Sequence, residues 1–305
     1  MSEKTVTVRV PGTTANCGPG FDSMGMACTI YNELTLTLLE DETIDIEVTG
    51  AGAEDIPINA TNVVWTTVRY LLEKAGNTTY HGCRMRMHNN VPLSRGLGSS
   101  ATAIVAGLKA ANVILDNYFD DDQLLKLATD IEGHPDNVAP AIFCGFTISA
   151  MHEGVPQCYH FMPEMPLKLV VAVPDFYLST SKARKVLPTE VSLKDAIFNV
   201  GRASMLAAAL AHNNAEFLKI AIDDKLHQPY RAQLIPGMYD VFAKAKEAGA
   251  LGVAMSGAGP CIIAFTLENN EAVGEAMKNE FARHYVNADI LQLELDSQGA
   301  IVIEN

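Results

Sequence analysis

The stretch Pro92-Leu-Ser-Arg-Gly-Leu-Gly-Ser-Ser-Ala-Thr-Ala103 constrains this chain more than any other part of its sequence. Gly96 and Gly98 lie two residues apart, and Ser99 and Ser100 follow at the start of a helix-forming run. Glycine lets the backbone turn its N–H groups toward one point and lets a bulky anion approach closely. The helix that starts there adds unpaired N–H groups and the positive end of its dipole. The stretch therefore predicts an anion cradle, most simply for phosphate.

Three other loop types are alternatives to such a cradle. A glycine turn with a serine N-cap would bind nothing, and Gly-Leu-Gly alone is common in turns. The spacing Gly96-x-Gly98-x-x-Ala101 fits the dinucleotide fingerprint, which also needs a second strand that ends in an acid about 20 residues on. Asp116 lies near that place, but one helical stripe runs up to it and leaves no room for the strand: Ile104, Leu108, Ala111 and Leu115. Because no Gly-Lys-Ser/Thr follows either, a Walker loop is excluded, and a nucleotide-binding loop of another kind remains.

The composition is that of a globular protein and limits its partners. A chain of 305 residues predicts one large domain or two of ordinary size. Its formal net charge is −14, with acidic residues gathered at 40–47 and 116–122. Such a chain is a poor general binder of nucleic acid and of anionic membranes. A nucleotide can still bind where glycine amides, Mg²⁺ and a few arginines converge.

Cysteine usage and the lack of long apolar runs indicate a cytoplasmic protein. The six cysteines show neither a C-x-x-C pair nor metal-ligand spacing, so reduced and mostly buried thiols are expected. The N-terminal sequence lacks the apolar region of a signal peptide, and no stretch approaches 18 uninterrupted apolar residues. We therefore expect a soluble, cytoplasmic protein with no membrane segment.

Strands and helices alternate in the N-terminal half. Residues 5–10 alternate as a strand that runs into a glycine- and proline-rich loop, residues 11–22. Residues 31–39 and 44–48 are expected to form a hairpin with its turn at 40–43. The other predicted elements are helices at 62–72 and 121–131, a strand at 83–91, and a helix from the glycine stretch to Leu115.

A dense group of polar residues, Glu132-Gly-His-Pro-Asp-Asn137, lies between two predicted helices. One interpretation is that Asp136 caps the second helix and that His134 lies on the surface. Four polar or ionisable side chains in six residues, bunched beside a proline, instead favour a functional segment.

The C-terminal half begins after a linker at residues 161–166. Strands are predicted at 167–173, 251–256, 261–267 and 290–295, and helices at 193–212, 215–226, 238–248 and 271–285. Their order predicts a split βαβ, ferredoxin-like layer. A basic segment, residues 179–185, is unusual in so acidic a chain.

Three glycine-rich loops each follow a predicted strand, at residues 11–22, 92–100 and 256–260, which suggests one site lined from both halves. The second loop resembles the phosphate loop of the GHMP kinases, the family of galacto-, homoserine, mevalonate and phosphomevalonate kinases. Residues 10–25 are similar to the N-terminal signature of its homoserine kinase branch, as are residues 133–140, 183–188 and 256–260. The Gly-Glu-His sugar motif of galactokinases is absent. Cys17 and Thr102 stand where Leu and Ala are usual.

The resemblance covers nearly the whole chain and implies both a fold and an activity. The fold is α+β, the two-domain GHMP kinase fold, with a ribosomal-protein-S5-like domain at 1–163 and a ferredoxin-like domain at 164–305. The activity is ATP-dependent phosphorylation of the side-chain hydroxyl of L-homoserine to O-phospho-L-homoserine, a step of threonine biosynthesis, with Mg²⁺. A homodimer is also implied. Another small-molecule kinase of the family (shikimate or mevalonate class) and a catalytically inactive binding protein of the same fold are the alternatives.

Site residues follow from the resemblance and from the chemistry of the substrates. The nucleotide contacts are Asn62, Pro92, Leu93, Ser94, Arg95, Gly96, Leu97, Gly98, Ser99, Ser100 and Ala101, although Asn62 would ordinarily be a helix cap. Mg²⁺ prefers oxygen ligands, for which Ser99 and Glu132 are suited.

The acceptor is expected to be held as a zwitterion. Its ammonium is assigned to Asp22 and Asn16. Its carboxylate is assigned to Arg184 and Arg231, with His134 beside them. Asn137 is expected to position the reacting hydroxyl, and Asp136 and Glu132 complete the catalytic group. Proton removal stays open, with the phosphate itself as one acceptor. Both arginines have a plainer interpretation as solvated surface side chains.

Overall fold

The first strand, β1 (Thr5–Ala15), has alternating valines whose side chains pack against a layer of helices. In the computed structural model, which describes residues 4–304, Val6, Val8 and Val10 are buried in the core. The threonines between them point the other way, where Thr5 and Thr7 meet hydroxyl groups of the next strand, β2 (Met24–Leu39). The period of two therefore separates a buried face from a polar face, as predicted.

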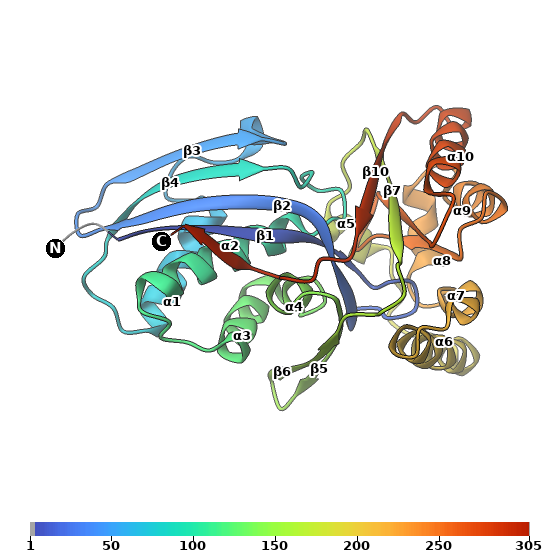
Figure 1. Ribbon diagram of the computed structural model, residues 1–305, viewed down its shortest axis with the longest axis horizontal. Coiled ribbons are helices and arrows are strands. Elements are labelled where there is room, and N and C mark those ends of the chain that lie inside the picture. Colours follow the sequence, from blue (N-terminus) through green and yellow to red (C-terminus); the bar gives the residue numbers. More distant parts are fainter. Residues whose placement is uncertain (1–3, 305) are drawn as a thin grey trace.

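The N-terminal sheet has seven strands, and β1 and β2 form its centre (Figure 1). The main path runs β11-β1-β2-β4-β3, and β5 and β6 extend it from the first part of β2. The remaining bounds are β3 Ile44–Gly50, β4 Gly82–Asn89, β5 Phe146–His152, β6 Val155–Phe161 and β11 Ile301–Glu304.

The predicted hairpin of residues 31–39 and 44–48 is wrong. Strand β4 lies between β2 and β3, antiparallel to β2 and parallel to β3. The helix α1 (Val63–Lys74) supplies the crossover that a parallel pair requires. The fully buried Cys83 and Met85 make β4 an interior strand with a neighbour on each side.

The predicted loop of residues 11–22 is shorter than expected. β1 stays paired with β2 as far as Ala15, and the register shifts between Pro11 and Gly12. A bulge there takes up the proline, which cannot donate a ladder hydrogen bond. The loop itself begins at Asn16.

Four helices cover one face of this sheet (Figure 1). Besides α1 they are α2 Ser99–Ile114, α3 Asp121–Glu132 and α4 Val138–Phe143. The three predicted helices of this half are confirmed within a few residues, because their apolar stripes are long and periodic.

The C-terminal sheet has four antiparallel strands in the order β10-β7-β9-β8. Their bounds are β7 Lys168–Pro174, β8 Gly252–Met255, β9 Ile262–Thr266 and β10 Ala288–Glu294. This order, with one helix between β9 and β10 and several between β7 and β8, confirms the ferredoxin-like layer. The helices are α5 Thr180–Lys185, α6 Leu193–Ala211, α7 Ala215–Ala221, α8 Gln228–Arg231, α9 Met238–Glu247 and α10 Asn270–Arg283, and short 3₁₀ turns lie at Ala53–Asp55 and Ala232–Leu234.

Helix α7 ends at Ala221 and not at Leu226 as predicted. The next residues form a separate turn, because the Asp224 carboxylate accepts hydrogen bonds from three backbone N–H groups just beyond it. A side chain that binds the backbone locally competes with continued helix.

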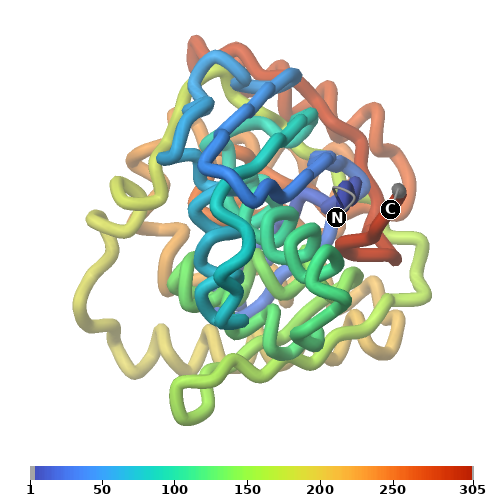
Figure 2. The backbone as a smooth tube through the Cα atoms, turned by 90° about the vertical axis from the view of Figure 1, so that its left-hand side faces the viewer, coloured from blue at the N-terminus to red at the C-terminus, as the bar shows by residue number. Residues whose placement is uncertain are grey.

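A shared apolar core joins the two sheets. Met26 and Phe146 of the first sheet pack in one cluster with Leu169 and Phe265 of the second. The chain also returns: after β10 it crosses back, and β11 pairs with β1 (Figures 1 and 2). The domain division at residue 163 stays a prediction; apart from β11, the two sheets follow it.

Two expectations about the chain as a whole can be set beside the structure. All six cysteines are free thiols, and four of them are buried. Within residues 4–304, no helix combines the length and the apolar character that crossing a membrane would take.

Asp296 lies in the segment that connects β10 to β11, and its contacts give the first prediction. Its buried carboxylate accepts hydrogen bonds from the Tyr31 hydroxyl at 2.9 Å and from the N–H groups of Gln298 and Gly299 at 2.9 and 2.6 Å. Asp296→Ala should lower the free energy of unfolding by about 1.5–3 kcal/mol in urea titrations. The exposed neighbour variant Ser297→Ala should change it by less than about 0.5 kcal/mol. Equal stability of the two variants would show that the carboxylate does not hold the crossing.

Candidate active site

A pocket at the junction of the two sheets brings the three glycine-rich loops together, as the sequence predicted. Its walls are Asn16, Asp22, Ser94, Gly96, Gly98, Ser99, Ser100, Glu132, His134, Asp136, Asn137, Leu178, Thr180, Arg184, Arg231, Gly257, Ala258 and Gly259. Every predicted substrate-binding residue and every predicted catalytic residue lies in this wall. The polar side chains face a common space although they come from loops far apart in the sequence.

The glycines of the second loop are required by neighbouring protein atoms. Gly96 and Gly98 have φ values of +86° and +70°. A Cβ atom on Gly98 would lie 2.0 Å from the Thr13 hydroxyl, and one on Gly96 would lie 2.2 Å from the Ser256 carbonyl oxygen. The space that the sequence assigned to an anion is thus filled by β1 and by the third loop. The glycines let the three loops meet.

The anion cradle itself is the N-terminus of α2. Gly98 is its N-cap residue. Glycine has no side chain that could accept a hydrogen bond, so no N-cap side chain satisfies the first N–H groups of the helix. Ser99 and Ser100 line the pocket at that point. Unpaired N–H groups and the helix dipole favour a negatively charged group.

Only part of the predicted nucleotide-binding set faces the pocket. Leu97 and Ala101 are fully buried, and their side chains pack in the two cores. Pro92, Leu93 and Arg95 lie outside the pocket wall. The side chains of Leu97 and Ala101 are therefore not available to a nucleotide, whereas contacts of Pro92, Leu93 and Arg95 stay a prediction.

Asn62 is a helix cap, which was its ordinary interpretation. Its Oδ1 accepts hydrogen bonds from the N–H groups of Val64 and Trp65, and its Nδ2 donates to the Pro57 carbonyl at 2.7 Å. The residue has no exposed surface. The structure therefore does not support the adenine contact that the resemblance implied.

Glu132 and Ser100 form the oxygen pair beside the cradle. The Ser100 hydroxyl donates to the Glu132 carboxylate at 2.7 Å, whereas Ser99 lines the same pocket without this contact. Burial raises the pKa of Glu132, partly offset by the Ser100 hydrogen bond and by His134. Carboxylate and hydroxyl oxygens are ligands that suit Mg²⁺.

His134 and Asp136 are paired in the wall of the pocket. His134 Nδ1 lies 2.5 Å from the buried Asp136 carboxylate. Burial lowers the pKa of His134, but the Asp136 hydrogen bond and the charges of Asp136 and Asp22 outweigh it, so the pKa is raised. Asp136 makes no helix cap, since Asn137 is the N-cap residue of α4 and no side chain caps that helix.

Asn137 is oriented by a residue that the sequence did not single out. The Thr13 hydroxyl donates to Asn137 Oδ1 at 2.9 Å, and Thr13 is fully buried on β1. The same threonine binds the Leu97 carbonyl through its N–H, so β1 holds both the glycine loop and Asn137.

Asp22 and Arg184 form an ion pair across the pocket. Arg184 Nη1 and Nη2 donate to the two Asp22 oxygens at 3.0 and 2.7 Å, a bidentate geometry between half-buried side chains. Asn16 holds this part of the loop: its Oδ1 accepts from the Asp22 N–H, and its Nδ2 donates to the Gly257 carbonyl. Asn16 thus joins the first and third glycine loops.

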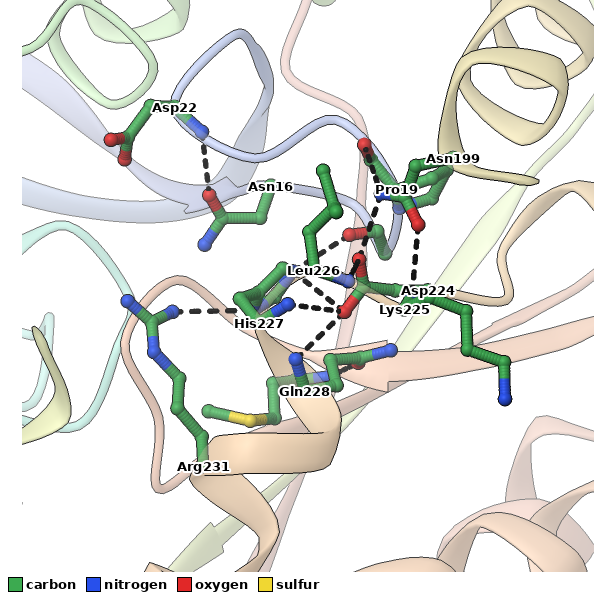
Figure 3. Close-up of polar contacts among 12 residues, drawn as sticks. Asn16, Pro19, Asp22, Asn199, Asp224, Lys225, Leu226, His227, Gln228 and Arg231 are labelled. Carbon is green, nitrogen blue, oxygen red and sulfur yellow. Dashed lines mark hydrogen bonds and ion pairs between the residues drawn. The ribbon is translucent and has the colours of Figure 1, made fainter. Parts of the chain in front are cut away.

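Arg231 is the most unusual charge in the pocket, being only 1% exposed. Its Nε donates to the Ala183 carbonyl at 3.1 Å, and its Nη1 lies 3.3 Å from both the Gly257 carbonyl and His227 Nδ1. Within residues 4–304 no ion pair involves Arg231, and no hydrogen bond involves its Nη2, which points away from His227 (Figure 3). Burial, and then Arg184, lower the pKa of Arg231 to about 10, so it stays charged at neutral pH. The plainer interpretation as a solvated surface side chain is wrong for Arg231, whereas the Arg184 side chain is 37% exposed and paired with Asp22.

Several pocket residues were missed in the sequence. Leu178 and Thr180 line the wall just before Arg184, and Phe21 lies under both guanidinium groups, at 5.6 Å from Arg184 and 5.1 Å from Arg231. Phe21 directly precedes the assigned Asp22, but a lone leucine, threonine or phenylalanine carries no motif that would single it out.

Taken together, an anion cradle at a helix start, a carboxylate–hydroxyl pair beside it and two guanidinium groups across the same pocket define the site of a small-molecule phosphotransferase. The known proteins that the chain resembles agree. Residues 62–145 match the family model of the GHMP kinase N-terminal domain, and residues 205–287 match that of the C-terminal domain.

Known proteins align with nearly the whole chain. The chain is 45% identical over 300 residues to a homoserine kinase of Carboxydothermus hydrogenoformans, which covers 98% of this chain and 97% of that one. A crystal structure of a homoserine kinase from Cytophaga hutchinsonii superposes with a TM-score of 0.90 at 30% identity, over 99% and 98% of the two chains. An L. major mevalonate kinase in complex with R-mevalonate shares the fold, with a TM-score of 0.74 at 16% identity over 97% of each chain. The chain belongs to the GHMP kinase family.

The cap at Asn62 gives a second prediction. Asn62→Ala should lower the free energy of unfolding by about 0.5–2 kcal/mol, because it removes the acceptor for two N–H groups, whereas Asn62→Ser keeps an acceptor and should lose less. The ATP affinity of both variants, measured by calorimetry, should equal that of the wild-type protein. A large loss of ATP affinity in the stable Asn62→Ser variant would restore the adenine contact.

Proposed function

We propose that this protein is an ATP-dependent homoserine kinase, which transfers the γ-phosphoryl group of ATP to the side-chain hydroxyl of L-homoserine in threonine biosynthesis. The observation that carries the proposal is the pocket itself, where the buried Arg231 guanidinium has no ion pair within the described residues and shares the wall with an anion cradle. Membership of a kinase family and the near-full-length identity to homoserine kinases support it.

The nucleotide side of the site uses the start of α2. Its open N–H groups hold the phosphates, and the hydroxyls of Ser99 and Ser100 lie beside them. Glu132 and a serine hydroxyl would hold Mg²⁺: the sequence predicts Ser99, and the hydroxyl of Ser100, which donates to Glu132 at 2.7 Å, would serve as a second ligand. When bound, the ion neutralises charge on the phosphates.

The acceptor side is built for a zwitterion. Arg231 Nη2 and the Arg184 guanidinium take the carboxylate, and Asp22 takes the ammonium. In the structure Asp22 and Arg184 neutralise each other, so substrate binding exchanges one internal ion pair for two pairs with the substrate. Both side chains stay paired in this exchange, because each one gains an oppositely charged group of the substrate. Asn16 acts mainly by holding Asp22 in place.

The reacting hydroxyl lies beside Asn137, which Thr13 orients. Phosphoryl transfer needs position and charge neutralisation more than covalent chemistry, and the site supplies both. Asp136 is engaged by His134 at 2.5 Å, so proton removal by the phosphate remains consistent with the geometry.

The alternatives fit the pocket less well. A mevalonate-type or shikimate-type acceptor carries a carboxylate but no ammonium, and Asp22 would then lack a substrate partner after the exchange. A binding protein without activity would not need the cradle, Glu132 and Asn137 together. A cytoplasmic location stays a prediction from cysteine usage and the lack of long apolar runs, and a homodimer stays a prediction from the family resemblance.

The proposed activity is tested by a coupled assay of ADP release. Homoserine should be turned over far better than mevalonate, shikimate or galactose. Faster ADP release with any of the other three alcohols than with homoserine would overturn the proposal. No ADP release with any of the four would overturn it as well.

Magnesium binding gives a separate prediction. Glu132→Gln should raise the Mg²⁺ concentration needed for half-maximal turnover by roughly tenfold or more, since even indirect partners change metal affinity 10- to 100-fold. The KM for homoserine should stay nearly constant. Asp130→Asn is the matched control, because Asp130 pairs with Lys126 on the surface of the same helix. An unchanged Mg²⁺ titration for Glu132→Gln, with a shifted one for Asp130→Asn, would move the ligand to Asp130.

A further inference from the structure

A chain of buried polar groups connects Arg231 to the loop that carries Asp22, and His227 is its centre (Figure 3). His227 is fully buried. Its Nε2 lies 2.7 Å from the Gly18 carbonyl oxygen, and its Nδ1 lies 3.3 Å from Arg231 Nη1. One ring therefore contacts the carboxylate subsite on one side and the ammonium loop on the other.

The chemistry of the two neighbours fixes the proton on this ring. A carbonyl oxygen only accepts, so Nε2 carries the hydrogen. A guanidinium only donates, so Nδ1 is the acceptor. His227 is thus a neutral imidazole with a defined tautomer. Burial lowers the pKa of His227; Arg231 acts in the same direction, while the Asp224 and Asp22 charges and the Gly18 hydrogen bond oppose it.

Asp224 fixes the backbone on which His227 and Arg231 stand. Its carboxylate accepts hydrogen bonds from the N–H groups of Leu226, His227 and Gln228 at 2.9, 3.0 and 2.7 Å. It also accepts from Asn199 Nδ2 at 2.9 Å, and this amide donates to the Pro19 carbonyl too. The same network therefore reaches the ammonium loop at a second point.

Phe21 adds an aromatic contact between the same two parts. Its ring stacks on His227 with centroids 5.0 Å apart and an interplanar angle of 22°. The next residue is Asp22, at φ +55°, a conformation that a non-glycine residue holds only when its surroundings impose it. The contacts of His227 with Gly18 and Phe21 hold the segment that leads directly into Asp22.

We propose that His227 is a positioning residue that sets the distance between the carboxylate subsite at Arg231 and the ammonium subsite at Asp22, and so selects acceptors that carry both charges on one carbon. The inference rests on the proposed function. His227 does not touch the reacting atoms; it acts through Arg231 Nη1 and through the Gly18 carbonyl.

Two near-isosteric variants separate the contact of His227 with Gly18 from its contact with Arg231. In His227→Gln the side-chain amide reaches the place of Nε2 and keeps a donor for Gly18, but the acceptor for Arg231 is lost. In His227→Asn the amide reaches the place of Nδ1 and keeps that acceptor, but the contact with Gly18 is lost. Each variant is assayed with homoserine as substrate and with two analogues as competitive ligands: 3-amino-1-propanol, which lacks the carboxylate, and 4-hydroxybutyrate, which lacks the ammonium.

The expected pattern is a crossed one. In His227→Gln the KM for homoserine and the inhibition constant of 4-hydroxybutyrate should rise about tenfold, while that of 3-amino-1-propanol stays constant, because its missing carboxylate already leaves Arg231 without a partner. In His227→Asn the inhibition constant of 3-amino-1-propanol should rise, and the inhibition constant of 4-hydroxybutyrate should stay unchanged. The KM for ATP should not move in either variant.

Equal losses for both analogues in both variants would overturn the positioning role and leave only a structural one. Failure of the wild-type protein to phosphorylate homoserine would instead overturn the proposed function, so the two failures are distinguishable. If neither variant folds, ¹⁵N NMR of the wild-type imidazole decides: a protonated Nε2 with a bare Nδ1 at pH 7 supports the role, and the reverse tautomer or an imidazolium overturns it.

Discussion

The burial of the Arg231 guanidinium is the constraint on which the site depends. A buried charge without a counter-charge is destabilising by several kcal/mol, so the fold must hold it by other means. Here it is held by two backbone carbonyls, by a neutral histidine and by the face of an aromatic ring. Within the described residues no carboxylate pairs with it, which leaves its remaining N–H groups and its charge available to a ligand. The positive charge that this fold maintains at such a position is itself an indication of an anionic acceptor.

The same constraint explains why three loops from two sheets must meet so closely. Arg231 binds the Gly257 carbonyl, Asn16 binds the same carbonyl from the other side, and the Ser256 hydroxyl binds the Gly96 carbonyl. These contacts join the third glycine-rich loop to Arg231, to the first loop and to the second loop. The shared core and the returning strand β11 join the two sheets, and the loops of both sheets line one pocket.

Much of this could be predicted from the sequence, because long periodic segments and dense polar motifs carry local signals. The helices and the ferredoxin-like order followed from periodicity. The site residues Asp22, Glu132, His134, Asn137, Arg184 and Arg231 were assigned from the family resemblance and the chemistry of the substrates, and they lie in one pocket as predicted. What failed depended on non-local pairing or on a different use of a residue. β4 inserts between β2 and β3, which no turn signal reveals. The β5–β6 hairpin, with no predicted element, turns at Glu153-Gly154, both at positive φ, where the glutamate is atypical. The loop glycines and Asn62 serve protein contacts that only the folded chain creates.

The account's central claim is that a zwitterionic acceptor displaces the Asp22–Arg184 ion pair and places its carboxylate on Arg231. The most direct measurement is a crystal structure with homoserine and a non-hydrolysable ATP analogue. The account predicts the substrate carboxylate within hydrogen-bonding distance of Arg231 Nη2 and of Arg184, with the Asp22 carboxylate turned to the ammonium group. An intact bidentate Asp22–Arg184 pair, with the homoserine carboxylate bound elsewhere, would contradict it.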